Sequence, residues 1–377
     1  MNMIEREFRR CLRCVMDTSA ENIKFDSDGI CNFCSDFFLS QGDLTGPSYQ
    51  QGGDLDHMVE EIKREGRDKP YDCVIGVSGG VDSSYVLVQA VQRGLRPLAV
   101  HMDNGWNSEL AQNNIANLIK SLKVDLHTHV IDWDEYRELM LAFLEADVVD
   151  VELLYDNAML GVNYRYAAKY GLKTIVAGSN KATEGIKIPD GWNWHKLDLR
   201  NIRDLADRRG VKLRTFPGIG SYRYAWYREI RKIRWLSLLD YMDYNKESAL
   251  RLLEDNYGFK RYPYKHYESV FTRFYQAVIL PRKYGIDKRL LHFSSLIVSG
   301  QMTRDDALLM LEQGTYPTKQ EEDEDLAYFL KKVGWDQDRF FDYLARERRG
   351  HDDYRTEINV WNRLMRLKNI RQTLITG

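Results

Sequence analysis

The stretch VIGVSGGVDSSYV, from Val74 to Val86, decides how the chain folds. Its apolar start predicts a strand, and its end predicts the first turns of a helix. The two glycines let backbone N–H groups approach an anion closely, and the helix adds its positive end. The lysine of the Walker A pattern is absent, so we expect a pyrophosphate cradle of another type. The residues expected to bind phosphate are Ser78, Gly79, Gly80, Ser83 and Ser84, with Asp82 as a magnesium ligand.

Strand-like and helix-like segments alternate around this loop. Apolar runs at 71–77, 96–103, 125–132 and 172–178 predict strands, and amphipathic segments between them predict helices. This alternation predicts an α/β fold with a doubly wound parallel sheet. Ligands in such sheets bind at the carboxyl ends of the strands. Three of the predicted strands end in polar loops, SGGVDSS, HMDNGW and GSNKATEG, which we expect to form one site.

Four of the five cysteines form two C-x2-C knuckles separated by sixteen residues. This spacing is typical of a closed, tetrahedral four-thiolate zinc site with a structural role. Iron in the same ligand set and a pair of disulfides are the alternatives, and a reducing compartment disfavours the disulfides. The predicted ligands are Cys11, Cys14, Cys31 and Cys34.

Composition favours a soluble, cytoplasmic protein. Hydrophobic residues make up 44% of 377 residues, and the net charge of −2 argues against a general nucleic-acid binder. No apolar run reaches membrane-spanning length, and the N-terminus lacks the apolar core of a signal peptide. We expect a zinc-binding module and linker at 1–54, an ATP-binding α/β domain at 55–234, and a helical C-terminal domain at 235–377.

The loop SGGVDSS resembles the signature of the PP-loop ATP pyrophosphatases. That family cleaves ATP to AMP and pyrophosphate and adenylates a carbonyl oxygen, which a nucleophile then displaces. A tight turn without a ligand is the alternative interpretation. The loop GSNKATE resembles that of NAD synthetases, in which a glutamate binds magnesium. The resemblance implies that Asp82 and Glu184 are catalytic magnesium ligands, and that the nucleotide contacts His101, Met102, Asp103, Gly178 and Asn180.

A closer resemblance extends over most of the chain. The motifs CLRCVMDTS, GICNFC, SGGVDSS, NWHKLDLRNI, KHYESVFTRFYQ and GIDKRLLHFSSLIVSGQMTRDDAL together resemble bacterial N-acetyl sugar amidotransferases of surface-polysaccharide (O-antigen) biosynthesis. The resemblance implies ATP, Mg²⁺ and Zn²⁺ as cofactors and a nucleotide-linked N-acetyl sugar as substrate. It also implies partner subunits that supply ammonia, a glutaminase and a cyclase-like barrel; a homodimer is compatible with it. Aromatic, basic and imidazole side chains expected at the sugar nucleotide are Trp194, His195, Lys196, Lys265, His266 and Arg273.

A tRNA-modifying enzyme of the same fold is the alternative function. Residues 196–234 hold twelve Lys and Arg against four Asp and Glu, and aromatic residues lie among them, as in nucleic-acid grooves. Thiolation requires a reactive cysteine, however, and only Cys73 is left outside the knuckles. Its apolar strand predicts a buried thiol. We therefore expect an amine or ammonia as the nucleophile.

Overall fold

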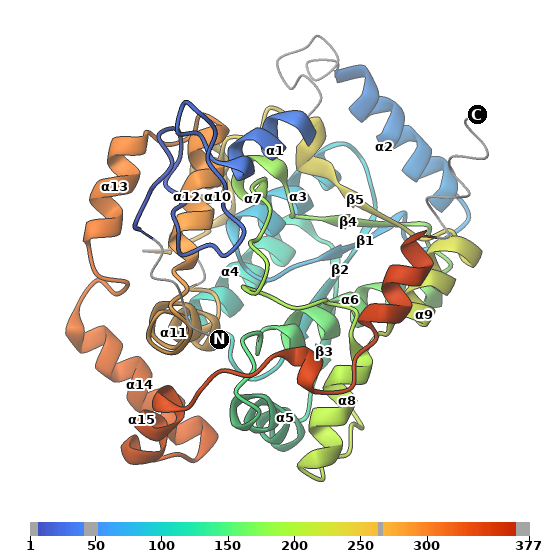
Figure 1. Cartoon of the computed structure of the whole chain (residues 1–377). Coiled ribbons are helices and arrows are strands. Elements are labelled where there is room, and N and C mark those ends of the chain that lie inside the picture. Colours follow the sequence, from blue (N-terminus) through green and yellow to red (C-terminus); the bar gives the residue numbers. More distant parts are fainter. Residues whose placement is uncertain (1–6, 41–51, 263–266, 367–377) are drawn as a thin grey trace.

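The computed structural model describes residues 7–40, 52–262 and 267–366. One five-stranded parallel sheet organises the molecule, with strand order β3-β2-β1-β4-β5 (Figure 1). The chain adds strands on one side of β1 and then returns to its other side with β4. The polarity of winding therefore reverses between β1 and β4, where doubly wound sheets bind their ligands. The strands are β1 (Cys73–Gly76), β2 (Pro97–Asp103), β3 (Asp125–Val130), β4 (Thr174–Ala177) and β5 (Arg234–Ser237).

Side chains alternate between the two faces of the sheet, as the strand period of two requires. Val74, Val100 and Ile175 pack into the larger core with α5 and α6. Ile75 and Val176 point the other way, into a second core with α2, α3 and α10. The helices of the α/β part that carry these cores are α2 (Gly52–Gly66), α3 (Val81–Gln92), α4 (Glu109–Leu122), α5 (Trp133–Glu145), α6 (Leu153–Lys169) and α10 (Lys246–Tyr257).

Shorter and peripheral helices complete the chain. The N-terminal cysteines precede or begin α1 (Asn32–Ser40), and α7 (Lys181–Glu184) follows β4 directly. The others are α8 (Leu199–Arg208), α9 (Ser221–Ala225), η1 (Trp226–Ile230), η2 (Leu238–Tyr241), α11 (Val270–Phe274), η3 (Tyr275–Tyr284), α12 (Lys288–Val298), α13 (Arg304–Glu312), α14 (Lys319–Val333), α15 (Gln337–Ala345) and η4 (His351–Asp353). Helices thus dominate the C-terminal part, as predicted.

The expected fold class is confirmed, with one strand more than the sequence suggested. β5 pairs in parallel with β4, and Ile175 lies opposite Trp235. This strand crosses the domain boundary expected between 234 and 235. Its four residues are all only partly buried, so they lack the apolar run of an inner strand.

The N-terminal module packs on the C-terminal helices rather than standing apart. Figure 1 shows its loops, in dark blue, over α12 and next to α7. Arg304 donates from its guanidinium to the carbonyls of Cys14 and Cys11, both at 3.0 Å. Among the described residues, none of the helices combines the length and apolarity that a membrane span requires.

Candidate active site

The glycine-rich loop has the backbone of an anion cradle. Gly79 has φ of +83°, and a Cβ there would lie 2.8 Å from the carbonyl oxygen of Ala111, so only glycine fits without strain. Gly80 is the extended N-cap of α3 and receives no side-chain capping bond. The Ser78 and Ser83 hydroxyls lie 3.2 Å apart across the loop. The first N–H groups of α3 thus face the loop, as an anion site requires.

The end of β4 lies against this cradle. A Cβ at Gly178 would lie 2.7 Å from the backbone nitrogen of Ser83, so glycine permits the close approach of the end of β4 to the first turn of α3. The loop and α7 therefore flank the point where the sheet reverses its winding. The Ser84 hydroxyl is buried and finds no partner within the described part of the chain. Ser84 faces the interior, whereas Ser78 and Ser83 line the loop.

One predicted magnesium ligand, Asp82, contacts a tyrosine hydroxyl, and the charge of the other, Glu184, acts on the same tyrosine. Tyr244 donates a hydrogen bond to Oδ1 of Asp82. Burial raises the pKa of Tyr244, and the negative charges of Asp82 and Glu184 raise it further. Glu184 is the last residue of α7, and its side chain is exposed. Both carboxylates therefore lie at one edge of the loop, and oxygen ligands of this kind fit Mg²⁺. Nothing in the sequence pattern indicated Tyr244.

The end of β2 uses its polar side chains to shape the neighbouring loop. His101 donates from Nδ1 to the Val77 carbonyl at 2.8 Å and accepts at Nε2 from Asn107 at 3.0 Å, which fixes the neutral tautomer. Met102 is 4% exposed. Asp103 accepts from the Gly105 N–H at 2.9 Å. The side chains of His101 and Met102 are thus committed to the protein, and the role of the three in nucleotide binding stays a prediction.

Asn180 has a structural task at the start of α7. Its Oδ1 accepts from the Thr183 N–H at 2.9 Å, and its Nδ2 donates to the Gly178 carbonyl at 3.1 Å. It is therefore the N-cap that turns the chain from β4 into α7. Through this cap it sets the direction in which Glu184 leaves the sheet.

The C-terminal part contributes directly to the rim of the loop. Ser108 donates from its backbone to the Glu268 carbonyl at 2.9 Å, and Val270 donates to the Trp106 carbonyl at 3.0 Å. These bonds place the Glu268 carboxylate 3.9 Å from the Cβ position of Gly80. The Tyr262 hydroxyl donates to the Gly79 carbonyl at 2.9 Å. The second half of the chain thus completes the phosphate site that the first half begins.

An acidic and basic cluster lies beyond Glu268. Lys196 contacts Asp150 at 2.6 Å and Asp156 at 2.8 Å. Burial alone would lower the pKa of Lys196, but the two carboxylates raise it, so it stays charged. Burial raises the pKa of Asp156, against the pull of Lys196. The Asp150 side chain is 2% exposed and that of Asp156 is 35% exposed. Asp150 therefore holds the Lys196 ammonium in the interior, and Asp156 is the more accessible of the two carboxylates.

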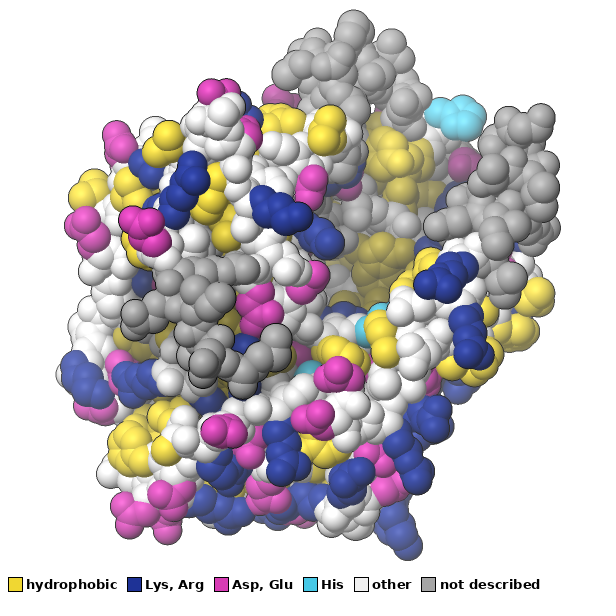
Figure 2. Space-filling view, viewed as in Figure 1, with side chains coloured by type: hydrophobic (Ala, Val, Ile, Leu, Met, Phe, Trp, Pro, Cys, Tyr) yellow, Lys and Arg dark blue, Asp and Glu magenta, His cyan; other side chains and the backbone are white. Residues whose placement is uncertain are grey.

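This cluster is connected to the loop through Tyr155. Burial raises the pKa of Tyr155, and the charges of Glu268 and then Asp156 raise it further. Figure 2 shows that this face of the molecule is deeply hollowed, in the region between α7 and α9. Tyr155 is thus influenced both by the Lys196 cluster and by Glu268, the residue whose carboxylate lies near Gly80.

The other predicted sugar-binding residues have partners inside the protein. The Trp194 indole stacks on His351 at 5.1 Å, and its N–H donates to Asp198 at 2.8 Å. The His195 ring packs against that of Trp361, tilted by 37° with centroids 4.7 Å apart, and its Nε2 has no partner within the described part of the chain. Burial lowers the pKa of His195, which keeps it neutral. The geometry gives Trp194 a packing role and leaves one free nitrogen on His195.

The predicted anion site of the C-terminal part is described only at Arg273. Its guanidinium forms two parallel hydrogen bonds to Asp325 and stacks over the Tyr267 ring at 4.3 Å. That charge is therefore balanced within the protein. Lys265 and His266 lie outside the described residues. A diphosphate contact for these three residues stays a prediction.

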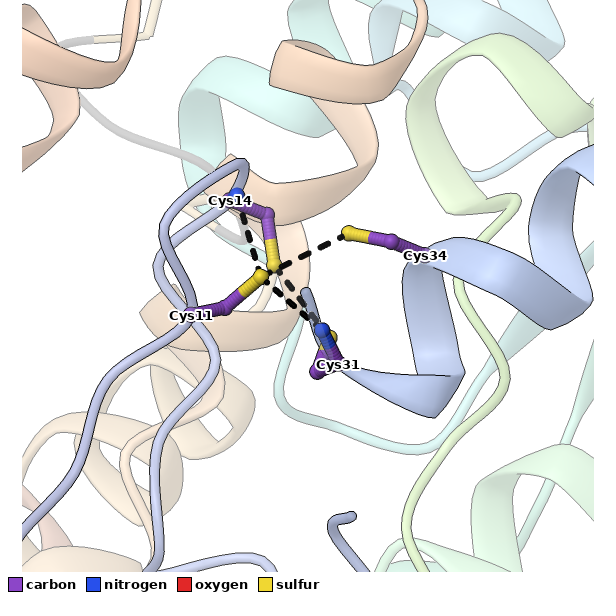
Figure 3. A group of neighbouring side chains, drawn as sticks. All are labelled: Cys11, Cys14, Cys31 and Cys34. Carbon is purple, nitrogen blue, oxygen red and sulfur yellow. Dashed lines mark hydrogen bonds between the residues drawn. The ribbon is translucent and has the colours of Figure 1, made fainter. Parts of the chain in front are cut away.

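The four N-terminal cysteines form a separate, closed site (Figure 3). The Sγ atoms of Cys11 and Cys34 are 3.9 Å apart, and those of Cys14 and Cys31 are 3.7 Å apart. A tetrahedron with Zn–S bonds of ~2.3 Å has edges of about 3.8 Å. All four residues are fully buried and none forms a disulfide. The spacing therefore fits a zinc ion, which would leave no open position for a substrate.

Hydrogen bonds to the sulfur atoms support this interpretation. The Cys31 N–H donates to Sγ of Cys11 at 3.2 Å, and the Met16 N–H donates to Sγ of Cys14 at 3.4 Å. Hydrogen bonds from the neighbouring thiols, that of Cys14 first, lower the pKa of Cys11, whereas that of Cys34 is raised, first by Cys11. Four thiolates cannot share this space without a cation, and a bound metal would ionise all four.

Comparisons with known proteins match two parts of the chain. The sequence model of the NAD synthase family matches residues 55–215. The model of the C-terminal domain of WbpG-like LPS biosynthesis proteins matches residues 268–368. A search of curated proteins finds no match.

Solved structures with similarity to the chain include two bacterial synthetases. The NH3-dependent NAD synthetase from Campylobacter jejuni is 17% identical over 54% of this chain and 92% of its own, with a TM-score of 0.28. The NMN synthetase from Francisella tularensis is 19% identical over 57% of this chain and 97% of its own, also with a TM-score of 0.28.

The family matches, the strand order and the loop define the class of protein. The chain is a member of the PP-loop ATP pyrophosphatase family, as the sequence predicted. Within that family, it joins an NAD synthase-like domain to the C-terminal domain of WbpG-like LPS biosynthesis proteins. Glu268, the residue that stands over Gly80, is also the first residue of the WbpG-like match.

Proposed function

We propose that the protein is an ATP-dependent amidotransferase of lipopolysaccharide O-antigen biosynthesis. Its substrate would be a nucleotide-linked N-acetyl sugar, whose acetamido group becomes an acetamidino group. One observation carries the proposal. A domain similar to NAD synthase and a WbpG-like domain occur in one chain, and Glu268 of the second lies next to Gly80 in the glycine-rich loop of the first. The coarser part, ATP-using amidation in lipopolysaccharide synthesis, follows from the two matches together.

The proposed reaction has two balanced steps. The acetamido oxygen attacks the α-phosphorus of ATP, forming an O–P bond while the bond to pyrophosphate breaks. Ammonia then attacks the imidate carbon, a C–N bond forms, and the C–O bond to AMP breaks. Asp82 and Glu184 would hold Mg²⁺, which would neutralise charge on the departing pyrophosphate. The N–H groups at the start of α3, with Ser78 and Ser83, would orient the phosphates before transfer.

Asp156 is the proposed proton acceptor for the attacking ammonia. The buried Asp150 holds Lys196, and Lys196 in turn holds Asp156 at the exposed edge of the cluster. Burial raises the pKa of the Asp156 carboxyl, which makes it a stronger base than an ordinary aspartate. Water would regenerate the amide, so the cluster would also have to favour ammonia over water.

Other elements of the proposal rest on the family resemblance. A glutaminase subunit and a cyclase-like barrel subunit would supply the ammonia, and a homodimer is compatible with the arrangement. The sugar nucleotide is expected to contact Lys196 and His195 and the segment around Lys265 and His266. We also propose a cytoplasmic location, where nucleotide sugars and ATP are made.

A tRNA-modifying activity is the second candidate, and local charges disfavour it. Several arginines of the basic segment are neutralised by neighbouring acids: Arg209 contacts Glu138 at 2.8 Å, and Arg234 contacts Glu61 and Glu65, each at 3.0 Å. Cys73 is fully buried in β1, and burial raises the pKa of its thiol. It is therefore a poor sulfur carrier.

The test is turnover with a panel of UDP-linked N-acetyl sugars, ATP, Mg²⁺ and ammonium. AMP should accumulate, and mass spectrometry should find a sugar in which one oxygen has become NH. Asp82→Asn should lower AMP formation at least about a hundredfold, since it removes a charge opposite the phosphates. Asp134→Asn, on the exposed start of α5, is the matched control. AMP formation that requires tRNA and leaves every sugar unchanged would replace this proposal with the second candidate.

A further inference from the structure

The residue that follows Glu184 lies against the four-cysteine module. A Cβ at Gly185 would be 2.3 Å from Cε2 of Phe37 and 2.3 Å from the Lys181 carbonyl oxygen. Phe37 is on α1, three residues after Cys34, and is 3% exposed. The Phe37 ring thus presses on the backbone at the C-terminal end of α7, where no side chain separates them. A short helix with one such contact on its last turn can be displaced by a small shift of that ring.

α12 holds α7 on another side. The Ser299 hydroxyl donates to the Ala182 carbonyl at 2.7 Å, and the Ile186 N–H donates to the Ser295 hydroxyl at 3.2 Å. These two bonds fix α7 before and after Glu184. Four residues are too few for a helix to be stable by its own hydrogen bonds, so its position is set by what packs on it.

A neighbouring side of α12 holds the cysteine loop. The Val15 N–H, next to Cys14, donates to the Ser294 hydroxyl at 3.3 Å. Ser294 and Ser295 are adjacent and both buried, so one turn of α12 contacts the metal-site loop and Ile186, the second residue after α7. Figure 1 shows the N-terminal loops over α12, and α7 beside it. The cysteine site and Glu184 are therefore linked through α1 and, independently, through α12.

We infer that Phe37 and Ser299 are positioning residues that hold Glu184 beside Asp82, so that the four-cysteine module sets the affinity of the ATP site for a divalent cation. The inference rests on the magnesium role proposed for Glu184. Residues behind a metal ligand commonly change metal affinity ten- to a hundredfold when mutated. The module is then part of the active-site architecture and more than a support for the N-terminus.

The test measures Mn²⁺ binding by electron paramagnetic resonance, with a non-hydrolysable ATP analogue and without turnover. Phe37→Ala should weaken Mn²⁺ binding roughly tenfold, and Glu184→Gln should weaken it at least as much. Leu39→Ala, on the same helix and 80% exposed, should leave it unchanged. The metal content of the cysteine site, measured by mass spectrometry, should stay that of the unmodified protein in all three variants.

Ser299→Ala provides a second route if Phe37→Ala does not fold. It removes only the bond to Ala182 and should weaken Mn²⁺ binding severalfold. Unchanged Mn²⁺ affinity in a folded Phe37→Ala protein, or in Ser299→Ala where that protein fails to fold, overturns the inference. Absence of analogue-dependent Mn²⁺ binding in the unmodified protein would instead contradict the magnesium site of the proposed function.

Discussion

His351 shows how one buried side chain can set the acid stability of the protein. It is 1% exposed and accepts the Asp150 N–H at Nε2, 3.2 Å away, while Nδ1 lies 2.8 Å from the Asn201 carbonyl oxygen. These partners require the neutral ring. Burial lowers the pKa of His351 from 6.5 to about 4.

Acid should therefore destabilise the fold through His351. The unfolded chain binds the proton first, so this part of the stability is complete above pH 6.5 and is lost as the pH falls toward 4. Between pH 7 and pH 5 the loss should be about 2 kcal/mol. Urea unfolding at the two pH values measures it. His351→Gln should reduce the difference, and the exposed His57→Gln should not; equal slopes in all three proteins would contradict this account.

Asp156→Asn separates the two proposed chemical steps. The amide keeps the size of the side chain but cannot accept a proton, so amidine formation should fall about a hundred- to a thousandfold. Pyrophosphate release in a single turnover, which reports the first step, should fall much less, because the phosphate site is intact. The rate of amidine formation by the unmodified protein should also decline at acidic pH, where the Asp156 carboxyl is protonated. The variant should not show this decline. Equal loss of single-turnover pyrophosphate release and of amidine would assign Asp156 to ATP binding instead.

Among the secondary-structure elements, Gly161 determines how closely α6 can approach the segment that follows α8. A Cβ there would lie 1.8 Å from the Pro217 carbonyl oxygen, which is backbone and cannot move aside cheaply. Alanine favours helix by about 1 kcal/mol over glycine, but overpacking costs more.

Gly161→Ala should therefore destabilise the protein by about 2 kcal/mol net. Denaturant unfolding measures the change. Ala168→Gly, near the end of the same helix and only partly buried, provides the comparison, since it should cost about 1 kcal/mol, mainly by loss of helix propensity. A stabilised Gly161→Ala protein would show that the backbone at Pro217 can withdraw.

Elements with a strong local signal were predicted from sequence, and those defined by distant partners were not. The loop, its flanking strand and helix, and the cysteine knuckles have motifs within a few residues. β5 has no apolar run, and Tyr244 and Asp156 look like ordinary helix or loop residues until the fold places them at the site. Trp194 was predicted to face a sugar, yet its indole N–H is bonded to Asp198. A sequence identifies each side chain, but it does not show which group that side chain contacts in the folded protein.

The four-cysteine site should support the whole molecule. Its loop contacts Ser294 and Arg304, far along the chain, so loss of the metal would loosen the C-terminal helices as well. Removal of the metal with a strong chelator should lower the unfolding midpoint by roughly 10 °C or more. Differential scanning calorimetry measures the change, and added Zn²⁺ should restore it. An unchanged midpoint with the metal gone would restrict the site to a local role.

The hydrogen bond between Val15 and Ser294 also joins two residues that the ribosome makes at different times. The two residues are 279 positions apart. At 5–20 residues per second, a ribosome takes about 14 to 56 s to make the second after the first. For that period the cysteine knuckles have been synthesised while the helix that will cover them does not yet exist. Nascent thiols left bare for so long are exposed to oxidants, so capture of the metal during translation would protect the chain before its fold can.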